Sequence, residues 1–339
     1  MSQKEKPEKR SNGSSKQRPE QQAWPSDRNF RILAIDGGGI KGIFPAAILA
    51  ELENLLPKGN TLSDHFDLIT GTSTGGIIAL GLAAGLNARD MLDMYIQNGA
   101  KIFPQSNFGF IKRLFVSRYN SLELENALKK TLHGTKIDEA NIALCIPTCE
   151  GTHGEVYIYK TPHHPRFKLD AREKMITVAL ATSAAPTYLK IQKHNGFKFI
   201  DGGLYANNPI MTGVVDALSS FDVPREKIQV LSLGCGTNLT PTNWFQEKFG
   251  GFLSWSSAIG TSIDLQSQNT LGQANLLIGA ENITRIEPSA EYGKLALDDY
   301  ENAARYLPDD AKLVLGKLDS RSLAPFLKCK AHGVRFFKV

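Results

Sequence analysis

Apolar runs alternate along this chain with longer segments in which apolar residues recur at helical spacing. The short runs predict buried strands, and the longer segments predict helices. Since strands and helices alternate, we expect an α/β protein with three layers, in which helices cover both faces of a mostly parallel central sheet. Strands are expected at residues 30–35, 66–69, 141–148, 155–160, 197–200, 228–233 and 283–286, and helices at 43–56, from 75 onward, 87–100, 120–132, 170–183, 259–280 and 309–318.

An uncharged stretch, residues 68–88, contains a sharp connection between an expected strand and an expected helix. It includes Gly71-x-Ser73-x-Gly75, in which a serine lies between two glycines. A serine on such a turn projects its hydroxyl from the backbone, and the N-terminus of the following helix favours negative charge on that oxygen. The alternative is a tight Gly-Ser turn without chemistry. Five glycines in this stretch argue against a membrane span.

Three consecutive glycines, Gly37 to Gly39, follow the first expected strand and lie between Asp36 and Lys41. A strand, a glycine loop and a helix together present backbone N–H groups to an anion. The spacing matches neither the P-loop nor the dinucleotide-binding motif. Three glycines in a row instead suit amides directed at one oxygen, as in an oxyanion hole. A phosphate-binding loop and a turn that merely requires glycine remain the alternatives.

Asp201 ends a short expected strand and is followed by Gly202 and Gly203. Because the two glycines carry no side chains, another group can approach the carboxylate directly. Asn207 and Asn208 can hydrogen-bond the loop and fix its shape. The alternative is an ordinary Asp-Gly turn. The carboxyl ends of parallel strands meet at one edge of a sheet, so we expect the glycine loop, the serine and this aspartate to converge there.

The 339 residues are 42% hydrophobic and 22% charged, which is typical of a globular protein with one large or two modest domains. The net charge is +5, of which residues 1–28 supply +3 through seven Lys or Arg and four Asp or Glu. The rest of the chain is therefore too weakly basic for a DNA-binding or RNA-binding protein. Four widely spaced cysteines lack the partners of a zinc site, so we expect no metal.

The first 28 residues are mainly Lys, Glu, Gln, Ser and Pro, and they bury too little apolar surface to fold. We expect a disordered leader at residues 1–28 and one folded domain at residues 29–339, with the motifs in a core at about 30–236. No apolar run follows Met1, so we expect no secretion signal and a reducing, cytoplasmic location.

Taken in order, Asp-Gly-Gly-Gly-x-Lys-Gly, Gly-x-Ser-x-Gly and Asp-Gly-Gly resemble the motifs of the patatin-like phospholipase family, over residues 30–236. The resemblance implies a Ser–Asp dyad in which Ser73 is the nucleophile and Asp201 is its base, with an acyl-serine intermediate. Family members commonly carry arginine at the position of Lys41, and lysine lacks the guanidinium fork. The resemblance also implies an oxyanion hole made by the amides of Gly37, Gly38 and Gly39, supported by Lys41, Gly42, Gly71, Gly75, Gly202 and Gly203.

An aspartate in water has a pKa near ~3.9 and is a poor base at neutral pH. Because desolvation raises the pKa of a carboxyl group, we expect Asp201 to be partly buried and within hydrogen-bond reach of Ser73. The seven histidines lie outside the glycine-rich loops, so we expect surface or structural roles for them.

The resemblance extends to bacterial effectors with N-terminal extensions, some of which are activated by cyclic dinucleotides in anti-phage defence. It implies a lipid acyl hydrolase that acts on membrane phospholipid, peripherally at the inner membrane. No cofactor is expected to be required, and a cyclic dinucleotide is the implied activator. The basic and aromatic segment Phe108–Arg118 is the candidate contact for the nucleotide. Assembly into a homo-oligomer is left open.

Three other functions compete with this hypothesis. One is a nucleotide-binding module that uses the loop from Asp36 to Gly42, and another is a catalytically idle storage or scaffold protein. A serine-reactive fluorophosphonate would label Ser73 in a hydrolase and not in either of these. The third is a thioesterase or protease with the same site, which only substrate profiling separates from a phospholipase.

Overall fold

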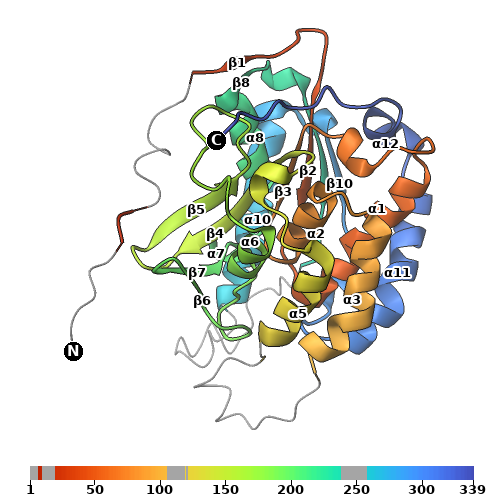
Figure 1. The fold of residues 1–339 in the computed structure, drawn as a ribbon. Coiled ribbons are helices and arrows are strands. Elements are labelled where there is room, and N and C mark those ends of the chain that lie inside the picture. Colours follow the sequence, from red (N-terminus) through yellow and green to blue (C-terminus); the bar gives the residue numbers. More distant parts are fainter. Residues whose placement is uncertain (1–6, 10–19, 105–118, 120, 238–257) are drawn as a thin grey trace, which may run out of the picture.

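The computed structural model describes residues 7–9, 20–104, 119, 121–237 and 258–339. An eight-stranded sheet lies at the centre of this region, built from β2 (Phe30–Ile35), β3 (Leu68–Gly71), β4 (Ala143–Glu150), β5 (Glu155–Lys160), β6 (Gln192–His194), β7 (Phe197–Asp201), β9 (Ile228–Leu233) and β10 (Ile283–Ile286). Its order is β10-β9-β2-β3-β4-β7-β6, and β5 also pairs with β4 (Figure 1).

Five neighbouring strands, from β10 to β4, are parallel, which confirms the expected mostly parallel sheet. The sheet departs from this pattern beyond β4, because β4 pairs antiparallel with both β5 and β7, and β7 pairs antiparallel with β6. This departure decides how the candidate catalytic residues meet.

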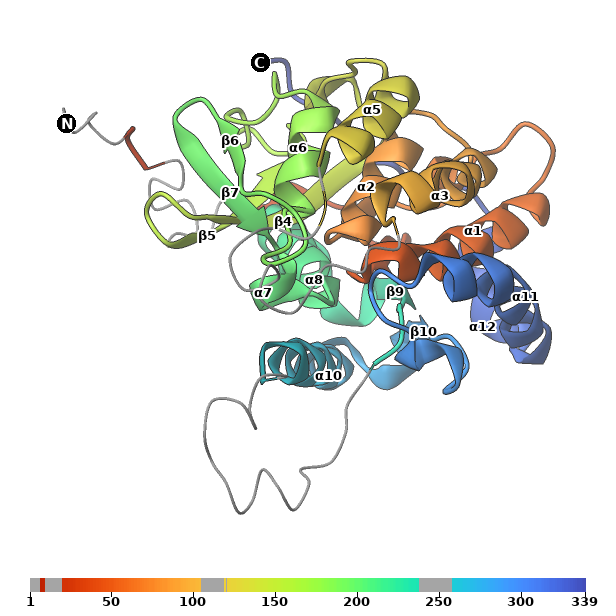
Figure 2. The ribbon, with the colours of Figure 1, turned by 90° about the horizontal axis from the view of Figure 1, so that it is seen from below.

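Helices cover both faces of the sheet, as expected (Figure 2). One face carries α8 (Ile210–Ser220) and α10 (Ala258–Ile278). The other face carries α1 (Ile43–Asn54), α2 (Thr74–Ala83), α3 (Ala88–Ile102), α5 (Ser121–Leu132), α6 (Met175–Thr182) and α11 (Tyr300–Lys317). The remaining short helices include α7 (Gly203–Ala206), which contacts α10, and α12 (Ser320–Leu327). Among the described residues, no helix combines the length and the hydropathy that crossing a membrane requires.

Strand β2 shows why both faces must be covered. Leu33 and Ile35 pack into the core beneath α1 and α2, whereas Ile32 and Ala34 pack into the core beneath α8. Successive side chains of a strand point to opposite faces, so an uninterrupted apolar run needs apolar partners on both sides.

Residues 20–28 correct the expectation of a disordered leader that reaches residue 28. Strand β1 (Gln22–Ala23) pairs with β8 (Phe221–Asp222). The Trp24 ring lies 4.7 Å from Phe30 and 5.6 Å from Phe221, measured between ring centroids. This large aromatic side chain therefore helps to hold a polar segment against the domain, together with hydrogen bonds from the Gln21 and Gln22 side chains. Residues 1–6 and 10–19 lie outside the described residues.

Two helices begin more than two residues away from the predicted position. The helix expected at residues 170–183 forms only at α6, because the Asp170 carboxylate accepts hydrogen bonds from the Tyr157 hydroxyl and the Lys160 amide and so ties the preceding segment to β5. The helix expected at 309–318 begins nine residues earlier, where Asp299 accepts a hydrogen bond from the Asn302 amide at the first turn of α11. Helix α8 was not predicted.

Candidate active site

Two strands end facing each other along one edge of β4. Thr70 of β3 pairs with Cys145 of β4. Asp201 of the antiparallel β7 pairs with Thr148, three positions further along β4. Both partners lie on the same edge, because β5 occupies the opposite edge along this stretch. The carboxyl ends of β3 and β7 are therefore directed at each other across roughly 10 Å, and Ser73 lies on the turn that leaves β3.

Ser73 adopts a backbone conformation that is rare for a residue with a side chain. Its φ is 54° and its ψ is −119°, and it directly precedes α2. Such a conformation costs on the order of 1–3 kcal/mol and persists only where the surroundings enforce it. The flanking glycines allow the turn, because a Cβ on Gly71 would lie 2.2 Å from the carbonyl oxygen of Gly75. The strained turn is typical of a nucleophile presented at the end of a strand.

A threonine that the sequence analysis did not single out holds this turn in place. The hydroxyl of Thr182, at the end of α6, donates to the carbonyl oxygen of Pro147 at 2.6 Å. The same hydroxyl accepts a hydrogen bond from the Ser73 amide at 3.0 Å. The Thr72 hydroxyl donates to the Ala206 carbonyl at 2.6 Å, which joins the serine turn to the loop after Asp201.

Ser73 and Asp201 are in direct contact. The Ser73 Oγ donates a hydrogen bond of 2.6 Å to Oδ2 of Asp201, and the Gly203 amide donates one of 2.7 Å to Oδ1. Asp201 is only 6% exposed. Burial raises the pKa of its carboxyl group to about 6, although both hydrogen bonds favour the ionised form. The expected burial and the expected contact are both present.

The glycine loop lies beside the serine but differs in one respect from the expectation. A Cβ built on Gly37 would lie 3.4 Å from the Ser73 Cβ. The Gly37 amide donates to the Asn207 carbonyl at 2.9 Å, so it is not free to contact an oxyanion, and the expectation for this residue is corrected. The amides of Gly38 and Gly39 have no partner among the described residues. Gly39 has a φ of +57°, which favours glycine.

Lys41 supports the loop through carbonyl groups. Its side chain is buried, and its Nζ donates to the carbonyl oxygens of Gly293 at 3.0 Å and Gly236 at 3.4 Å. Burial lowers the pKa of this amine. The lysine therefore joins the loop to later parts of the chain. A point charge is sufficient for this task, whereas a guanidinium fork would be needed to bind an anion through two parallel hydrogen bonds.

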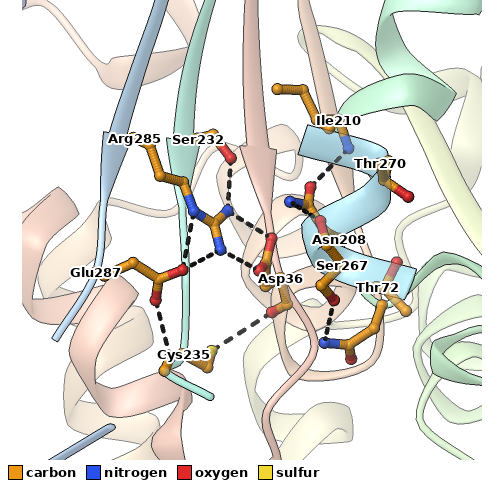
Figure 3. Close-up of polar contacts among 12 residues, drawn as sticks. Asp36, Thr72, Asn208, Ile210, Ser232, Cys235, Ser267, Thr270, Arg285 and Glu287 are labelled. Atoms are coloured by element: carbon orange, nitrogen blue, oxygen red, sulfur yellow. Dashed lines mark hydrogen bonds and ion pairs between the residues drawn. The ribbon is translucent and has the colours of Figure 1, made fainter. Parts of the chain in front are cut away.

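Two asparagines fix the loop that follows Asp201, as expected. The Asn208 Oδ1 accepts from the Ile210 amide at 3.0 Å, at the start of α8 (Figure 3). The side-chain amide of Asn207 donates to the Ser267 Oγ of α10 at 3.4 Å. Helix α10 thus braces this loop from the α8 face of the sheet.

Residues 33–214, more than half of the chain, match the sequence model of the family described as patatin-like phospholipase. This chain belongs to the patatin-like phospholipase family. The match confirms the resemblance that the three motifs indicated, and both members of the Ser–Asp pair fall within it.

Relatives of this family member include bacterial and plant proteins. The "cGAMP-activated phospholipase" of Pseudomonas aeruginosa is 37% identical over 213 residues, which cover 61% of this chain and 62% of that protein. The protein of the same name from Vibrio cholerae is 37% identical over 225 residues, covering 60% and 63%. "Patatin-like protein 2" of Arabidopsis thaliana is 33% identical, covering 66% and 64%. The chain thus spans less than two thirds of each of these relatives.

VipD from Legionella pneumophila is a solved structure that matches part of this chain. It is 13% identical to this patatin-like chain, with a TM-score of 0.43, and the match covers 86% of this chain and 67% of VipD.

One group of possible metal ligands occurs among the described residues. Cys145, His163 and Asp216 each offer a ligand atom, and these atoms lie within 4.8 Å of one another. The Lys160 Nζ, however, lies 2.6 Å from Asp216 Oδ1, and the His163 Nε2 lies 2.8 Å from Asp216 Oδ2. An ammonium group already neutralises the carboxylate and would repel a cation, so the cluster is a buried ion-pair network. His163 is thus one of the structural histidines.

Proposed function

We propose that this chain is a serine lipid acyl hydrolase that cleaves acyl esters of membrane phospholipids. The hydrogen bond of 2.6 Å from Ser73 Oγ to the buried carboxylate of Asp201 carries this proposal. A serine hydroxyl needs an adjacent base to act as a nucleophile, and a carboxyl group whose pKa is about 6 is mostly ionised at neutral pH. Membership of the patatin-like phospholipase family supports ester hydrolysis as the reaction.

The proposed reaction proceeds through an acyl-serine. As the Ser73 Oγ forms a bond to the acyl carbonyl carbon, its proton passes to Asp201. The carbonyl oxygen becomes an oxyanion, for which the amides of Gly38 and Gly39 are the proposed donors. The C–O bond to the alcohol then breaks, and the departing lysolipid takes the proton from Asp201. Water repeats the sequence on the acyl-serine and releases the fatty acid.

Contacts of the glycine loop disfavour its use as a phosphate cradle. The amides of Gly37 and Ile40 donate to the carbonyl oxygens of Asn207 and Leu297, each at 2.9 Å. Lys41 is buried against two further carbonyl groups. A phosphate-binding loop needs several free amides and a free lysine. The amides of Gly38 and Gly39, for which the described residues provide no partner, suit a single oxyanion better.

The activity is tested with purified protein and phospholipid vesicles. We expect mass spectrometry to detect free fatty acid and lysolipid, and a fluorophosphonate to label Ser73. Labelling without lipid release, but with hydrolysis of thioesters or peptides, would replace the phospholipase with a thioesterase or protease. Absence of both labelling and hydrolysis would support a binding or scaffold protein.

Regulation by a cyclic dinucleotide is a second part of the proposal. It is supported by the names of the P. aeruginosa and V. cholerae relatives, "cGAMP-activated phospholipase". In this setting the enzyme would act peripherally at the inner membrane in anti-phage defence. It would require no cofactor, and it would bind neither DNA nor RNA. The candidate contact, Phe108–Arg118, lies outside the described residues.

Addition of cGAMP is expected to increase fatty acid release by the wild-type protein about 5- to 150-fold, since an effector contributes typically about 1–3 kcal/mol of coupling. The measurement compares initial rates with cGAMP, with a mixture of AMP and GMP, and without nucleotide. The mononucleotide mixture is the control for non-specific effects of the bases and phosphates. Equal rates in all three conditions would remove the regulatory part and leave the hydrolase.

The rate of hydrolysis is expected to rise with pH through about 6 and then to level off. Asp201 acts as a base only when it is ionised, and burial raises its pKa to about 6. Below this value kcat/KM should fall about tenfold per pH unit, because the protonated carboxyl group cannot accept the serine proton. Rates measured from about pH 4.5 to 8.5 test this. A midpoint near ~4, that of an ordinary aspartate, would contradict it.

A further inference from the structure

Arg285 of β10 reaches the first residue of the glycine motif. Its Nη1 donates to Asp36 Oδ1 at 3.0 Å and its Nη2 donates to Oδ2 at 2.5 Å (Figure 3). The sheet register makes this contact possible, since Arg285 pairs with Ser232 of β9 and Ser232 pairs with Ala34 of β2. Asp36 follows Ala34 by two positions, and the Arg285 Nη1 also donates to the Ser232 hydroxyl at 2.6 Å.

The two ends of the glycine loop are joined through a single residue, Gly236. At one end, Arg285 Nε donates to Glu287 Oε1 at 3.0 Å, and Glu287 Oε2 accepts from the Gly236 amide at 3.0 Å. At the other end, the Lys41 Nζ contacts the Gly236 carbonyl oxygen at 3.4 Å. Asp36, Arg285, Glu287, Gly236 and Lys41 therefore form a chain of polar contacts, and the loop itself closes this chain into a ring.

Burial makes this ring costly to break. The side chains of Asp36 and Arg285 are 5% and 16% exposed, and two parallel charge-assisted hydrogen bonds join them. Burial raises the pKa of Asp36 to about 6, although Arg285 favours its charged form. A buried carboxylate that loses its partner must move, become protonated or recruit water, and each change would act directly on Gly37.

The amides of Gly38 and Gly39, which have no partner in the described part of the chain, lie between the two anchored ends of the loop. Donors in an oxyanion hole act only when they are held at the right position before the reaction begins. A displacement of about 1 Å can cost roughly 100-fold in rate. The pairing of β10 with β9 and of β9 with β2 brings Arg285 and Glu287 to Asp36. Arg285 and Glu287 lie outside residues 33–214, which match the family model.

We propose that Arg285 is a positioning residue that holds the oxyanion loop through Asp36. It contacts no reacting atom, and it acts by fixing the start of the loop while Lys41 fixes the end. The inference rests on the proposed hydrolase, because the loop has this role only if Ser73 forms an acyl-enzyme.

The test replaces Arg285 by lysine and, separately, by methionine. Arg285→Lys keeps the positive charge but cannot bind both carboxylate oxygens, and we expect kcat to fall about 10-fold. Arg285→Met should lower kcat about 100-fold, with KM within about twofold of wild type in both variants. Asp36→Asn should match Arg285→Met, and the double variant should be no worse than either single variant, because both break one interaction.

The matched control is Lys160→Met, which breaks another buried ion pair, with Asp216, outside the loop. It should lower the melting temperature while leaving kcat within about twofold of wild type. A readout specific to the loop is the 31P NMR signal of the phosphonylated Ser73, whose phosphoryl oxygen occupies the oxyanion hole. This signal should shift in the Arg285 variants and stay unchanged in Lys160→Met.

The outcomes separate the two proposals. If wild type neither hydrolyses esters nor reacts with fluorophosphonate, the hydrolase proposal fails. If wild type is active and folded Arg285→Lys and Arg285→Met keep wild-type kcat and the wild-type phosphorus signal, the positioning role is overturned. A loss of kcat in Lys160→Met as large as that in Arg285→Met would also overturn it, since destabilisation alone would then account for the effect.

Discussion

Replacing Ser73 by alanine is expected to lower kcat for phospholipid hydrolysis by roughly 10⁴- to 10⁶-fold while the protein stays folded. The substitution removes the only protein atom proposed to bond to the acyl carbon. It also removes the hydrogen bond of 2.6 Å to Asp201 but leaves the turn intact, because the Ser73 amide is bound by the Thr182 hydroxyl. Fatty acid release measured by mass spectrometry, together with circular dichroism and the melting temperature, tests the prediction.

Ser220→Ala provides the control for removal of a buried serine hydroxyl. Ser220 is fully buried, and its hydroxyl has no hydrogen-bond partner among the described residues. Its loss should leave activity within about twofold of wild type. Folded Ser73→Ala that kept more than about 1% of wild-type activity would end the acyl-serine mechanism, because the remaining groups cannot form that intermediate.

Replacing Asp201 by asparagine is expected to lower kcat roughly 10³- to 10⁴-fold and, at the same time, to stabilise the protein at neutral pH. Asparagine can still accept the Gly203 hydrogen bond, but it cannot take the serine proton. Loss of function with a gain in stability would separate a catalytic role from a structural one. The measurements are fatty acid release and melting curves at about pH 4 and pH 8.

The sign of the stability change follows from the pKa. Burial raises the pKa of Asp201 to about 6, whereas an aspartate in the unfolded chain titrates near ~3.9. The folded state therefore binds the proton more tightly, and folding stability falls as the pH rises from about 4 through about 6. The cost above pH 6 is on the order of 1–3 kcal/mol. Asp201→Asn removes this cost, so its advantage should be present at pH 8 and absent at about pH 4.

Asp216→Asn is the matched control. The Asp216 carboxylate is also buried, but it contacts Lys160 and His163, which lower its pKa. Burial alone would raise its pKa, but Lys160 and His163 outweigh this effect and hold the pKa well below its usual range. Its contribution to stability is present above about pH 4, so Asp216→Asn should destabilise the protein at neutral pH. If Asp201→Asn lowers the melting temperature at pH 8, as Asp216→Asn is expected to do, the explanation given for Asp201 is wrong.

Local patterns predicted the parts of the fold that depend on neighbouring residues. The bounds expected for β2, β5, β9 and β10 are those observed, because each is a short apolar or alternating run with clear ends. The strained turn at Ser73 was also predictable, since the flanking glycines are needed by the turn itself. Helix boundaries that depend on partners elsewhere in the chain were not predictable. An example is the start of α6, which lies later than expected because the Asp170 carboxylate binds β5.

The convergence of Ser73 and Asp201 was predicted, but for an incomplete reason. We expected the carboxyl ends of parallel strands to share one edge of the sheet. Instead β7 is antiparallel to β4, and Asp201 approaches Ser73 from the opposite direction along the same edge. Strand direction in a sheet depends on pairing between distant segments, and the apolar pattern of a five-residue strand is the same in either direction.

The sequence alone determined the α/β class, the serine at the strand-to-helix turn and the aspartate before two glycines, because these depend on local spacing and on what glycine permits. The tertiary structure decided which groups the active-site residues contact. It assigned the Gly37 amide to Asn207, buried Lys41 against carbonyl groups, and brought Arg285 to Asp36 from 249 positions away. A hydrogen bond forms only where folding brings a donor and an acceptor together. The spacing of residues along the chain does not indicate which donor will meet which acceptor.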